Sequence, residues 1–222
     1  MTELRTVEDR LRAEYFELIP VMQRTLVALE ADVRHYLLPV MIALNRYEQV
    51  RIAARLKECE SAVDSLRRRQ EGRVFDPEKP EAYSLSQLRD LVAVRVLVFP
   101  SYRREEVHTA LLPLLSDWAS DPVPGIEPGD APVARKYYGR CSSASTTLTA
   151  ELQVVSSLIG SYWDVEHSAL YKASPNLQDV MRSPSMKARQ RAVLSALSDF
   201  ETEFERLIRE AAEIEASQDG GG

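Results

Sequence analysis

The stretch Leu91-Val-Ala-Val-Arg-Val-Leu-Val-Phe99 decides the fold. It is apolar and rich in β-branched residues except at Arg95, and Pro100 follows it, so we expect it to be a buried strand. Residues 50–57 and 146–155 alternate in character with a period of two, which favours a strand in each. The Ala, Leu and Arg residues of the first of these two segments would also suit a helix.

Helical periodicity is found on both sides of these strands. Apolar residues recur at helical spacing over residues 4–37, where Pro20 is expected to separate two helical stretches and Pro39 to end the second. Residues 121–132 hold four prolines and two glycines and are expected to form an irregular loop. Further helices are predicted at residues 58–71, 105–118, 157–171 and 185–216, with a short one after an N-cap at Ser84. Strands separated by helices, with long helices at both ends, predict an α+β domain around a mixed β-sheet.

The composition excludes several classes of protein. Of the 222 residues, 45% are apolar and 28% are charged, which is too apolar for a disordered chain. Cys59 and Cys141 are 82 positions apart, so we expect neither a disulfide scaffold nor a structural zinc site, and a cytoplasmic location is favoured. The charged N-terminus argues against a signal peptide, and the longest nearly apolar run, residues 36–44, is too short to span a membrane.

Charge is unevenly distributed along the chain. Residues 199–219 hold eight acidic and two basic residues and therefore account for the whole formal net charge of −6. This acidic helix could brace the domain, contact another copy or bind a neutralising antitoxin. Basic residues cluster at 51–73 and again in a second group, which favours a local anion site, although a solvated helix face would have the same pattern. The second group is Arg135, Lys136 and Arg140, beside Tyr137 and Tyr138.

Two carboxylates are candidates for metal binding. Asp90 stands immediately before the strand of residues 91–99, and Glu151 lies on the polar side of the strand of residues 146–155. If the two strands meet near one edge of the sheet, both carboxylates could hold Mg²⁺ together with phosphate oxygens. The alternative is that they are two separate surface acids.

A phosphate site is expected where residues 50–57 lead into the following helix. If that segment is extended, Arg55 and Lys57 share a strand face, while Ser61 and Arg68 share a helix face. The free N–H groups at a helix N-terminus, together with basic side chains, form a suitable cradle for phosphate.

Arg95 interrupts an otherwise apolar strand. Its guanidinium must lie against an anion or a flat ring, because an unpaired buried charge is very costly. A buried salt bridge, for instance with Asp90, is the alternative to a role in ligand binding.

Four motifs in this order resemble those of the RelA/SpoT-type alarmone synthetases. Residues 55–61 are similar to the family's R-x-K-x-x-E-S segment, and residues 90–96 to D-L-x-G-x-R-V, with Ala93 in place of glycine. Residues 151–154 are similar to the E-x-Q-[IV] strand, and residues 163–172 to the W-x-x-[IV]-E-H…Y-K helix. The resemblance implies N-terminal helices over residues 1–49, a nucleotidyltransferase-like synthetase core over 50–172 and an acidic C-terminal helix over 173–222, all in one structural domain.

The resemblance also implies an activity. Synthetases of this family transfer the β,γ-diphosphate of ATP to a ribose 3′-hydroxyl, and Asp90 and Glu151 would bind the Mg²⁺ that this reaction uses. Glu151 would also accept the proton of the attacking hydroxyl, while Arg55 and Arg95 would lie on the two sides of adenine. The remaining implied roles are ATP phosphate binding by Lys57, Ser61 and Arg68, acceptor binding by Tyr137, Tyr138, Gln153 and His167, and binding of acceptor phosphates by Arg135, Lys136 and Arg140.

The sequence departs from the family pattern at two places, and the second concerns the acceptor. Ser65 stands where the family usually has a lysine, and residues 135–143 lack the histidine of the family's G-Y-x-S-x-H loop. The chain resembles the short single-domain synthetases, some of which are toxins that modify the 3′-terminal adenosine of tRNA. The resemblance therefore implies that the acceptor is GDP or GTP, giving ppGpp or pppGpp, or a tRNA end. The alternative is a catalytically inactive relative that acts as a regulator by binding protein.

Overall fold

The computed structural model describes residues 6–125, 132–143, 146–171, 180–181 and 183–219. Five strands form one sheet in the order β1-β2-β5-β4-β3. β2 and β5 are parallel and every other neighbouring pair is antiparallel, so the sheet is mixed and the predicted α+β class is confirmed. The strands are β1 Gln49–Leu56, β2 Val92–Phe99, β3 Ala119–Ser120, β4 Ala134–Ser143 and β5 Thr146–Ser156.

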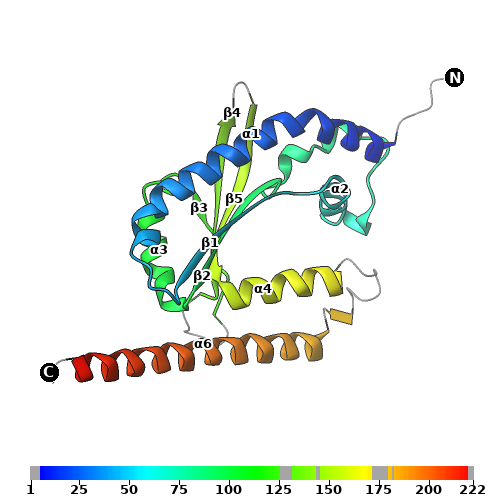
Figure 1. Cartoon of the computed structure of the whole chain (residues 1–222). Coiled ribbons are helices and arrows are strands. Elements are labelled where there is room, and N and C mark those ends of the chain that lie inside the picture. The colour runs from blue at the N-terminus through cyan, green and yellow to red at the C-terminus, as the bar shows by residue number, and fades with distance from the viewer. Residues whose placement is uncertain (1–5, 126–131, 144–145, 172–179, 182, 220–222) are drawn as a thin grey trace.

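Helices cover both faces of this sheet. One face lies under α1 and α3, and the other is flanked by α4 and α6 (Figure 1). No helix among the described residues is long and apolar enough to cross a membrane. The helices are α1 Val7–Ile42, α2 Cys59–Arg67, α3 Arg104–Leu111, α4 Ser157–Glu166 with a π-helical turn at His167–Tyr171, and α6 Pro184–Asp219; short 3₁₀ turns occupy Glu71–Arg73, Pro80–Ala82, Leu85–Gln87 and Ser101–Arg103.

The N-terminal segment is one continuous helix, so the expected break at Pro20 and the expected stop at Pro39 are wrong. Both prolines lie inside α1, where each removes a backbone donor and crowds the preceding turn. Buried residues recur on both sides of Pro20, from Leu11 and Tyr15 to Met22 and on to Val40. Packing of this long apolar stripe on the sheet outweighs the local cost of the two prolines.

Three other expectations need correction. The helix expected over residues 58–71 ends at Arg67, and the one expected over residues 105–118 is helical only from Arg104 to Leu111. Residues 134–143 form strand β4, where the sequence predicts an acceptor loop over residues 135–143. By contrast, the short helix after Ser84 is confirmed, since the Ser84 side chain accepts a hydrogen bond from the backbone N–H of Ser86.

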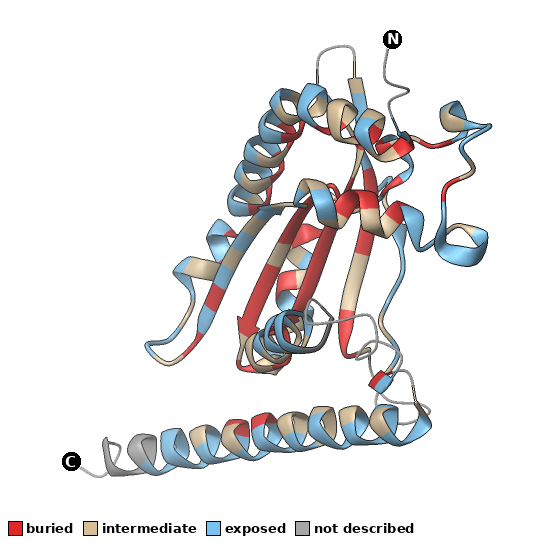
Figure 2. Ribbon diagram, turned by 90° about the vertical axis from the view of Figure 1, so that its right-hand side faces the viewer, coloured by how far each residue is buried: buried red, intermediate tan, exposed pale blue. Residues whose placement is uncertain are grey.

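The main core lies between the sheet and α1. Val92, Val94, Val96 and Val98 of β2 are all fully buried there, and they occupy alternate positions of one strand as a period of two requires. Figure 2 shows the buried residues concentrated in the central strands and on the side of α1 that faces them.

A second, smaller apolar cluster lies on the opposite face of the sheet. Leu97 and Val155 contact Ile159 of α4 there. Gly160 allows this approach, because a Cβ atom at that position would come within 2.3 Å of the Leu97 side chain. Leu194 and Leu197 of α6 pack against the same cluster, so it joins both helices to the sheet.

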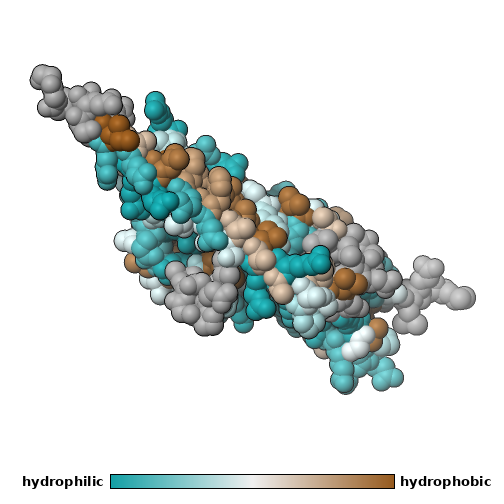
Figure 3. All heavy atoms as spheres, turned by 90° about the horizontal axis from the view of Figure 1, so that it is seen from below, coloured by the Kyte–Doolittle hydropathy of each residue, from teal (hydrophilic) through white to brown (hydrophobic). Residues whose placement is uncertain are grey.

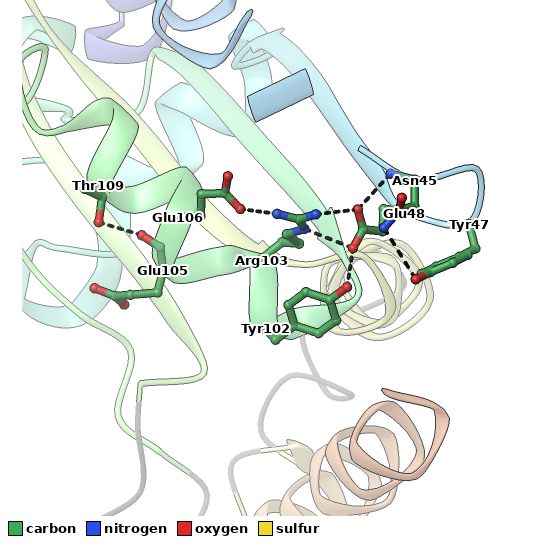
Figure 4. A network of polar contacts seen from close by, with 8 residues as sticks. All are labelled: Asn45, Tyr47, Glu48, Tyr102, Arg103, Glu105, Glu106 and Thr109. Atoms are coloured by element: carbon green, nitrogen blue, oxygen red, sulfur yellow. Dashed lines mark hydrogen bonds and ion pairs between the residues drawn. The ribbon is translucent and has the colours of Figure 1, made fainter. Parts of the chain in front are cut away.

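A polar network fastens the loop between α1 and β1 to the start of α3 (Figure 4). The Glu48 carboxylate, whose side chain is fully buried, accepts hydrogen bonds from Arg103 Nε at 3.0 Å and Arg103 Nη2 at 2.8 Å, and from the Tyr102 hydroxyl. It also accepts from the backbone N–H of Asn45 at 2.8 Å. Burial alone would raise the pKa of Glu48, but these hydrogen bonds and the Arg103 charge lower that pKa to about 2.

Candidate active site

The strand register gathers polar side chains on the face of the sheet opposite the main core. In one row across the sheet, Arg55, Ala93, Glu151 and Tyr138 are successive partners on β1, β2, β5 and β4. The next row, also from β1 to β4, holds Ala53, Arg95, Gln153 and Lys136. Directly paired residues on neighbouring strands share a face, so the charged residues of three separate sequence motifs lie together.

These two rows form the floor of a cleft that α4 closes on one side. Small residues at Ala53 and Ala93 leave room between the longer side chains, and both line the cleft. The part of the cleft next to α4 is lined by Arg55, Asp90, Arg95, Lys136, Glu151, Gln153, Trp163, Asp164, Glu166, His167 and Ser168.

The same cleft continues toward α2. Arg55, Asp90 and His167 line both parts, so the two are contiguous. Ser61 and Arg68, predicted to bind phosphate, lie in the α2 part. Arg68 Nε forms an ion pair at 3.0 Å with Asp64 on the preceding turn of α2. The strand-to-helix corner predicted from sequence is therefore present, and it opens into the cleft.

Arg95 is held by two groups on the cleft face. Its Nε donates to Gln153 Oε1 at 2.9 Å, and its Nη1 forms an ion pair with Asp164 Oδ1 at 2.6 Å. The sequence left open a salt bridge between Arg95 and Asp90. In the structure Arg95 instead forms its salt bridge with Asp164 of α4. Arg55 is exposed, and no other described side chain forms an ion pair with it. One guanidinium is fixed and the other is open to a ligand.

Asp90 pairs with the lysine at the end of β1. Lys57 Nζ and Asp90 Oδ2 lie 2.5 Å apart, and both side chains are about four-fifths buried, with exposures of 18% and 23%. The second oxygen, Asp90 Oδ1, is buried and has no hydrogen-bond partner among the described residues. Burying a carboxylate oxygen that has no hydrogen-bond partner costs free energy, unless a bound ligand supplies the missing partner.

Glu151 is buried in the floor of the cleft, with an exposure of 5%. The sequence places Glu151 on the polar side of its strand, but that side is not open to solvent, because α4 covers it. Its carboxylate accepts a hydrogen bond from the Gln153 side-chain amide, and Tyr138 is its direct neighbour on β4. Burial, followed by the charge of Glu151, raises the pKa of Tyr138 well above its usual range. The Tyr138 hydroxyl therefore stays protonated beside the Glu151 carboxylate.

The two tyrosines of the predicted acceptor segment face opposite sides of the sheet. Tyr137 is buried in the main core, where its hydroxyl hydrogen-bonds with His108 Nδ1 at 2.9 Å and its ring stacks on the imidazole. Tyr138 is on the cleft face, and the Arg89 guanidinium lies over its ring at 5.6 Å from the centroid. Of the two, only Tyr138 is placed to meet a ligand.

Gly139 makes room for a core side chain. A glycine after two tyrosines suits a loop that approaches a flat ligand, but Gly139 lies in β4 and faces the indole of Trp118. A Cβ atom at position 139 would lie 2.0 Å from that ring. Any larger residue here would therefore displace Trp118.

The predicted basic group of this segment is also divided by the sheet. Lys136 lines the cleft, and its ammonium lies 5.8 Å from the centre of the Trp163 ring. Arg135 points to the other face and pairs with Glu105 at 2.7 Å. Arg140 is exposed and aligns with Thr149 nearer the far end of the β4–β5 hairpin. The three cations do not form one surface.

The residues of the cleft fit a magnesium ion. Asp90 and Glu151 line the same cavity, and Asp90 has an oxygen that no described group satisfies. No cluster of three or more His, Cys, Asp or Glu residues suitable for a metal is present in the described part of the chain. Mg²⁺ takes one or two carboxylates and completes its shell with water and phosphate oxygens, so two carboxylates in a cleft that basic residues also line are a sufficient donor set.

Sequence reasoning missed Asp164 and Arg89. Asp164 and His167 are three residues apart on one helix face, and this spacing could have placed both residues beside the cleft. Arg89 precedes Asp90 and approaches Tyr138 from a segment 49 positions earlier in the chain, which no local pattern could indicate.

The architecture on which these residues are arranged is that of the small alarmone synthetases. Three solved structures share it over most of their length. The small alarmone synthetase 1 from Bacillus subtilis, bound to its product pppGpp, is 15% identical, with a TM-score of 0.60, 88% of this chain covered and 96% of that one. A GTP pyrophosphokinase family protein from Streptococcus pneumoniae is 18% identical, with a TM-score of 0.59 and coverages of 89% and 96%.

The third solved structure is the small alarmone synthetase 2 from Bacillus subtilis. It is 13% identical, with a TM-score of 0.57, 87% of this chain covered and 99% of that one. The first of these proteins has also been solved bound to AMPCPP. No family model and no curated protein sequence matches the chain. At these identities the likeness establishes the fold.

Proposed function

We propose that the chain is an ATP-dependent pyrophosphokinase that transfers the β,γ-diphosphate of ATP to a ribose 3′-hydroxyl. The observation that carries the proposal is the gathering of Asp90 and Glu151 with Lys57, Arg55 and Arg95 in one cleft. In the reaction the 3′-oxygen forms a bond to the β-phosphorus, the bond between the α,β-bridging oxygen and that phosphorus breaks, and AMP leaves. Phosphoryl transfer of this kind depends mainly on positioning and on neutralisation of charge.

The donor nucleotide would lie between β1 and α4. Arg55 is exposed at the edge of this space, and Arg95 is held flat by Gln153 and Asp164, so the two guanidinium planes can enclose adenine. Lys57, Ser61 and Arg68 line the adjoining part of the cleft and would bind the phosphates. The AMPCPP-bound structure of a protein with this fold supports binding of an ATP-like donor.

Asp90 and Glu151 would hold the magnesium ion, which would neutralise charge on the transferred phosphates. Glu151 has a second task, because its carboxylate is the group placed to accept the proton of the attacking hydroxyl. The hydrogen bond from the Gln153 side-chain amide fixes the orientation of that carboxylate. Lys57 holds Asp90 in place through their ion pair.

The acceptor would bind on the β4 side of the cleft. Tyr138 supplies an aromatic ring there, Gln153, His167 and Lys136 line the cavity, and Arg140 lies further along the same strand face. Two acceptors suit these groups: GDP or GTP, giving ppGpp or pppGpp, and the 3′-terminal adenosine of tRNA. Modification of tRNA would block translation and would make the chain a toxin that requires an antitoxin. The pppGpp-bound relative supports the guanine nucleotide.

The test is to incubate the chain with magnesium and γ-³²P-labelled ATP, and with GDP, GTP or bulk tRNA in separate reactions. Label in a guanine nucleotide or in tRNA identifies the acceptor. Labelling of tRNA should fall steeply with added salt, because several backbone phosphates must be bound, whereas transfer to a free nucleotide should fall less. Label in no acceptor, from a chain that still binds ATP, would refute the proposal and favour an inactive relative that acts through protein binding.

A further inference from the structure

The two long helices contact different parts of the chain around the cleft. α6 crosses the underside of the molecule, where hydrophobic side chains follow one another on its exposed side (Figure 3), and Gln190 of α6 donates a hydrogen bond to Glu166 at the end of α4. The first turns of α1 lie instead beside α2 and the 3₁₀ turn of Leu85–Gln87 (Figure 1). The N-terminal end of α1 therefore borders the part of the cleft that is proposed to bind the phosphates of ATP.

Tyr15 of α1 holds the chain where strand β1 ends. Its ring is buried in the main core, and its hydroxyl donates a hydrogen bond to the backbone carbonyl of Lys57 at 2.7 Å. The backbone N–H of Lys57 donates to the carbonyl of Leu91 at 2.9 Å. Both backbone polar groups of Lys57 are thus engaged, which fixes the starting point of the side chain that reaches Asp90.

Arg12 of α1 holds the start of α2. Its Nε and Nη2 donate to the two carboxylate oxygens of Glu60 at 2.8 Å and 3.1 Å, and such a two-point contact fixes direction as well as distance. Glu60 precedes Ser61 and lines the same part of the cleft. The Arg12 and Glu60 side chains are 40% and 71% exposed, so their ion pair contributes little to the stability of the fold. What the pair fixes is the position of α2 relative to α1.

Two further residues of α1 hold the segment that leads to Asp90. Arg10 Nη2 donates to the backbone carbonyl of Pro80 at 2.8 Å. Glu14 Oε1 accepts a hydrogen bond from the Ser84 hydroxyl at 2.6 Å. The segment before Asp90 is therefore fastened to the same turns of α1 as the end of β1 and the start of α2.

These four residues reach the three segments that supply the proposed phosphate and metal ligands on the α2 side of the cleft. The segments are the end of β1 with Lys57, helix α2 with Ser61, and the residues before Asp90. We call the four residues the α1 clamp: Arg10, Arg12, Glu14 and Tyr15. We infer that the α1 clamp positions the groups that bind the phosphates of ATP, with Tyr15 acting through Lys57 and Arg12 acting through α2. The inference rests on the proposed function.

Phosphate binding and adenine binding should respond differently to a defect in the α1 clamp. Donors must lie at hydrogen-bond distance from the phosphate oxygens, so a small displacement of Lys57 or of α2 weakens binding steeply. Arg95, which is proposed to stack on adenine, is held by Gln153 and Asp164 instead. A defect in the clamp should therefore reduce the affinity for a nucleoside triphosphate and spare the affinity for AMP.

The first test is calorimetric titration of the whole chain, in the presence of magnesium, with AMPCPP and separately with AMP. The methylene bridge of AMPCPP prevents transfer, so only binding is measured. Tyr15→Phe removes a single hydroxyl, and it should weaken AMPCPP binding about tenfold while the affinity for AMP stays unchanged. Tyr36→Phe is the matched control, because Tyr36 lies on the same helix and packs against the same core; it should change neither affinity.

The second test separates position from charge at Arg12. Glu60→Gln removes the partner of Arg12 and also removes a negative charge near the phosphates. If Arg12 acts by holding α2, Glu60→Gln and Arg12→Gln should each weaken AMPCPP binding about threefold. If Arg12 acts only through its positive charge, Glu60→Gln should strengthen that binding. Arg34→Gln is the control, since Arg34 forms an ion pair with Glu30 at 2.7 Å elsewhere on α1, and it should leave binding unchanged.

Three results would overturn the inference and leave the proposed function standing. Equal losses of AMPCPP and AMP affinity in Tyr15→Phe would show a general loss of structure. Unchanged AMPCPP binding in Tyr15→Phe would show that Lys57 is positioned without the hydroxyl. Tighter AMPCPP binding by Glu60→Gln would assign Arg12 a role through charge alone. A wild-type chain that binds no AMPCPP would refute the proposed function itself, and the inference with it.

Discussion

The two faces of the sheet are made by neighbouring residues of the same strands, yet they are organised differently. On β5, Leu152 is fully buried under the α1 layer, while Glu151, the residue before it, is in the floor of the cleft. The α1 face is apolar, and its side chains make many similar packing contacts. The stabilising free energy is therefore distributed over the whole core. The cleft face depends on a few charged groups that must keep their partners. A substitution on one face should therefore alter stability, and one on the other should alter catalysis.

The largest expected effect is on the cleft face. Glu151→Gln keeps the shape of the side chain but removes its charge and its ability to accept a proton. The rate of pyrophosphate transfer should fall at least about 100-fold, with little change in melting temperature. Asp90→Asn should have a similar effect, since it removes the other carboxylate of the proposed metal site. Transfer at the wild-type rate by either variant would contradict the assignment.

The adjacent position on the other face should respond in the opposite way. Leu152→Ala removes a fully buried side chain from the main core, and the free energy of unfolding should fall by about 2–5 kcal/mol. Chemical denaturation measures that loss. The rate of transfer per folded molecule, measured well below the new midpoint, should stay within a few-fold of wild type. A large loss of rate without a loss of stability would show that the two faces are not separate.

The α1 face is easier to predict from sequence than the cleft face. The valines of β2 alternate along an apolar strand, so the residue pattern of 91–99 is by itself enough to indicate a buried strand. The two other predicted strands, residues 50–57 and 146–155, are confirmed for the same reason. Strand β4 is missed because Tyr137 and Tyr138 are adjacent and both large, so the segment shows no clear alternation of polar and apolar residues.

The composition of the cleft is partly predictable and its contacts are not. The motifs that resemble the alarmone synthetases single out Arg55, Asp90, Arg95 and Glu151, and the structure places these residues around one cavity. Their partners depend on tertiary packing. Asp164 reaches Arg95 only because Gly160 lets α4 approach β2, and the opposite orientations of Lys136 and Arg135 follow from a strand where the sequence predicts a loop.

A smaller effect on the cleft face is expected at Arg95. Arg95→Lys keeps the positive charge but removes the flat guanidinium, so the Michaelis constant for ATP should rise about tenfold while the melting temperature changes little. Asp164→Asn should raise the Michaelis constant for ATP by a smaller factor, since it only loosens the position of Arg95. Arg34→Lys is a matched control, because Arg34 pairs with Glu30 at 2.7 Å on α1, away from the cleft. If Arg95 were only a structural ion-pair partner, Arg95→Lys would lower the melting temperature and leave the constant unchanged.

The smallest expected effect is on the free energy of unfolding. It concerns the Glu48–Arg103 network, which fastens the loop between α1 and β1 to the start of α3. Glu48 has a pKa of about 2 in the folded protein, below its ordinary value of 4.5. A carboxylate whose pKa is lowered by folding contributes stability above its unfolded pKa and loses it as the pH falls through its folded pKa. The free energy of unfolding should therefore decline between about pH 4.5 and pH 2, and Glu48→Gln should make that decline shallower. Glu17→Gln, at an exposed position of α1, is the control and should leave the slope unchanged. Equal slopes for wild type and Glu48→Gln, measured by denaturation at several pH values, would show that the Glu48–Arg103 network does not stabilise the fold.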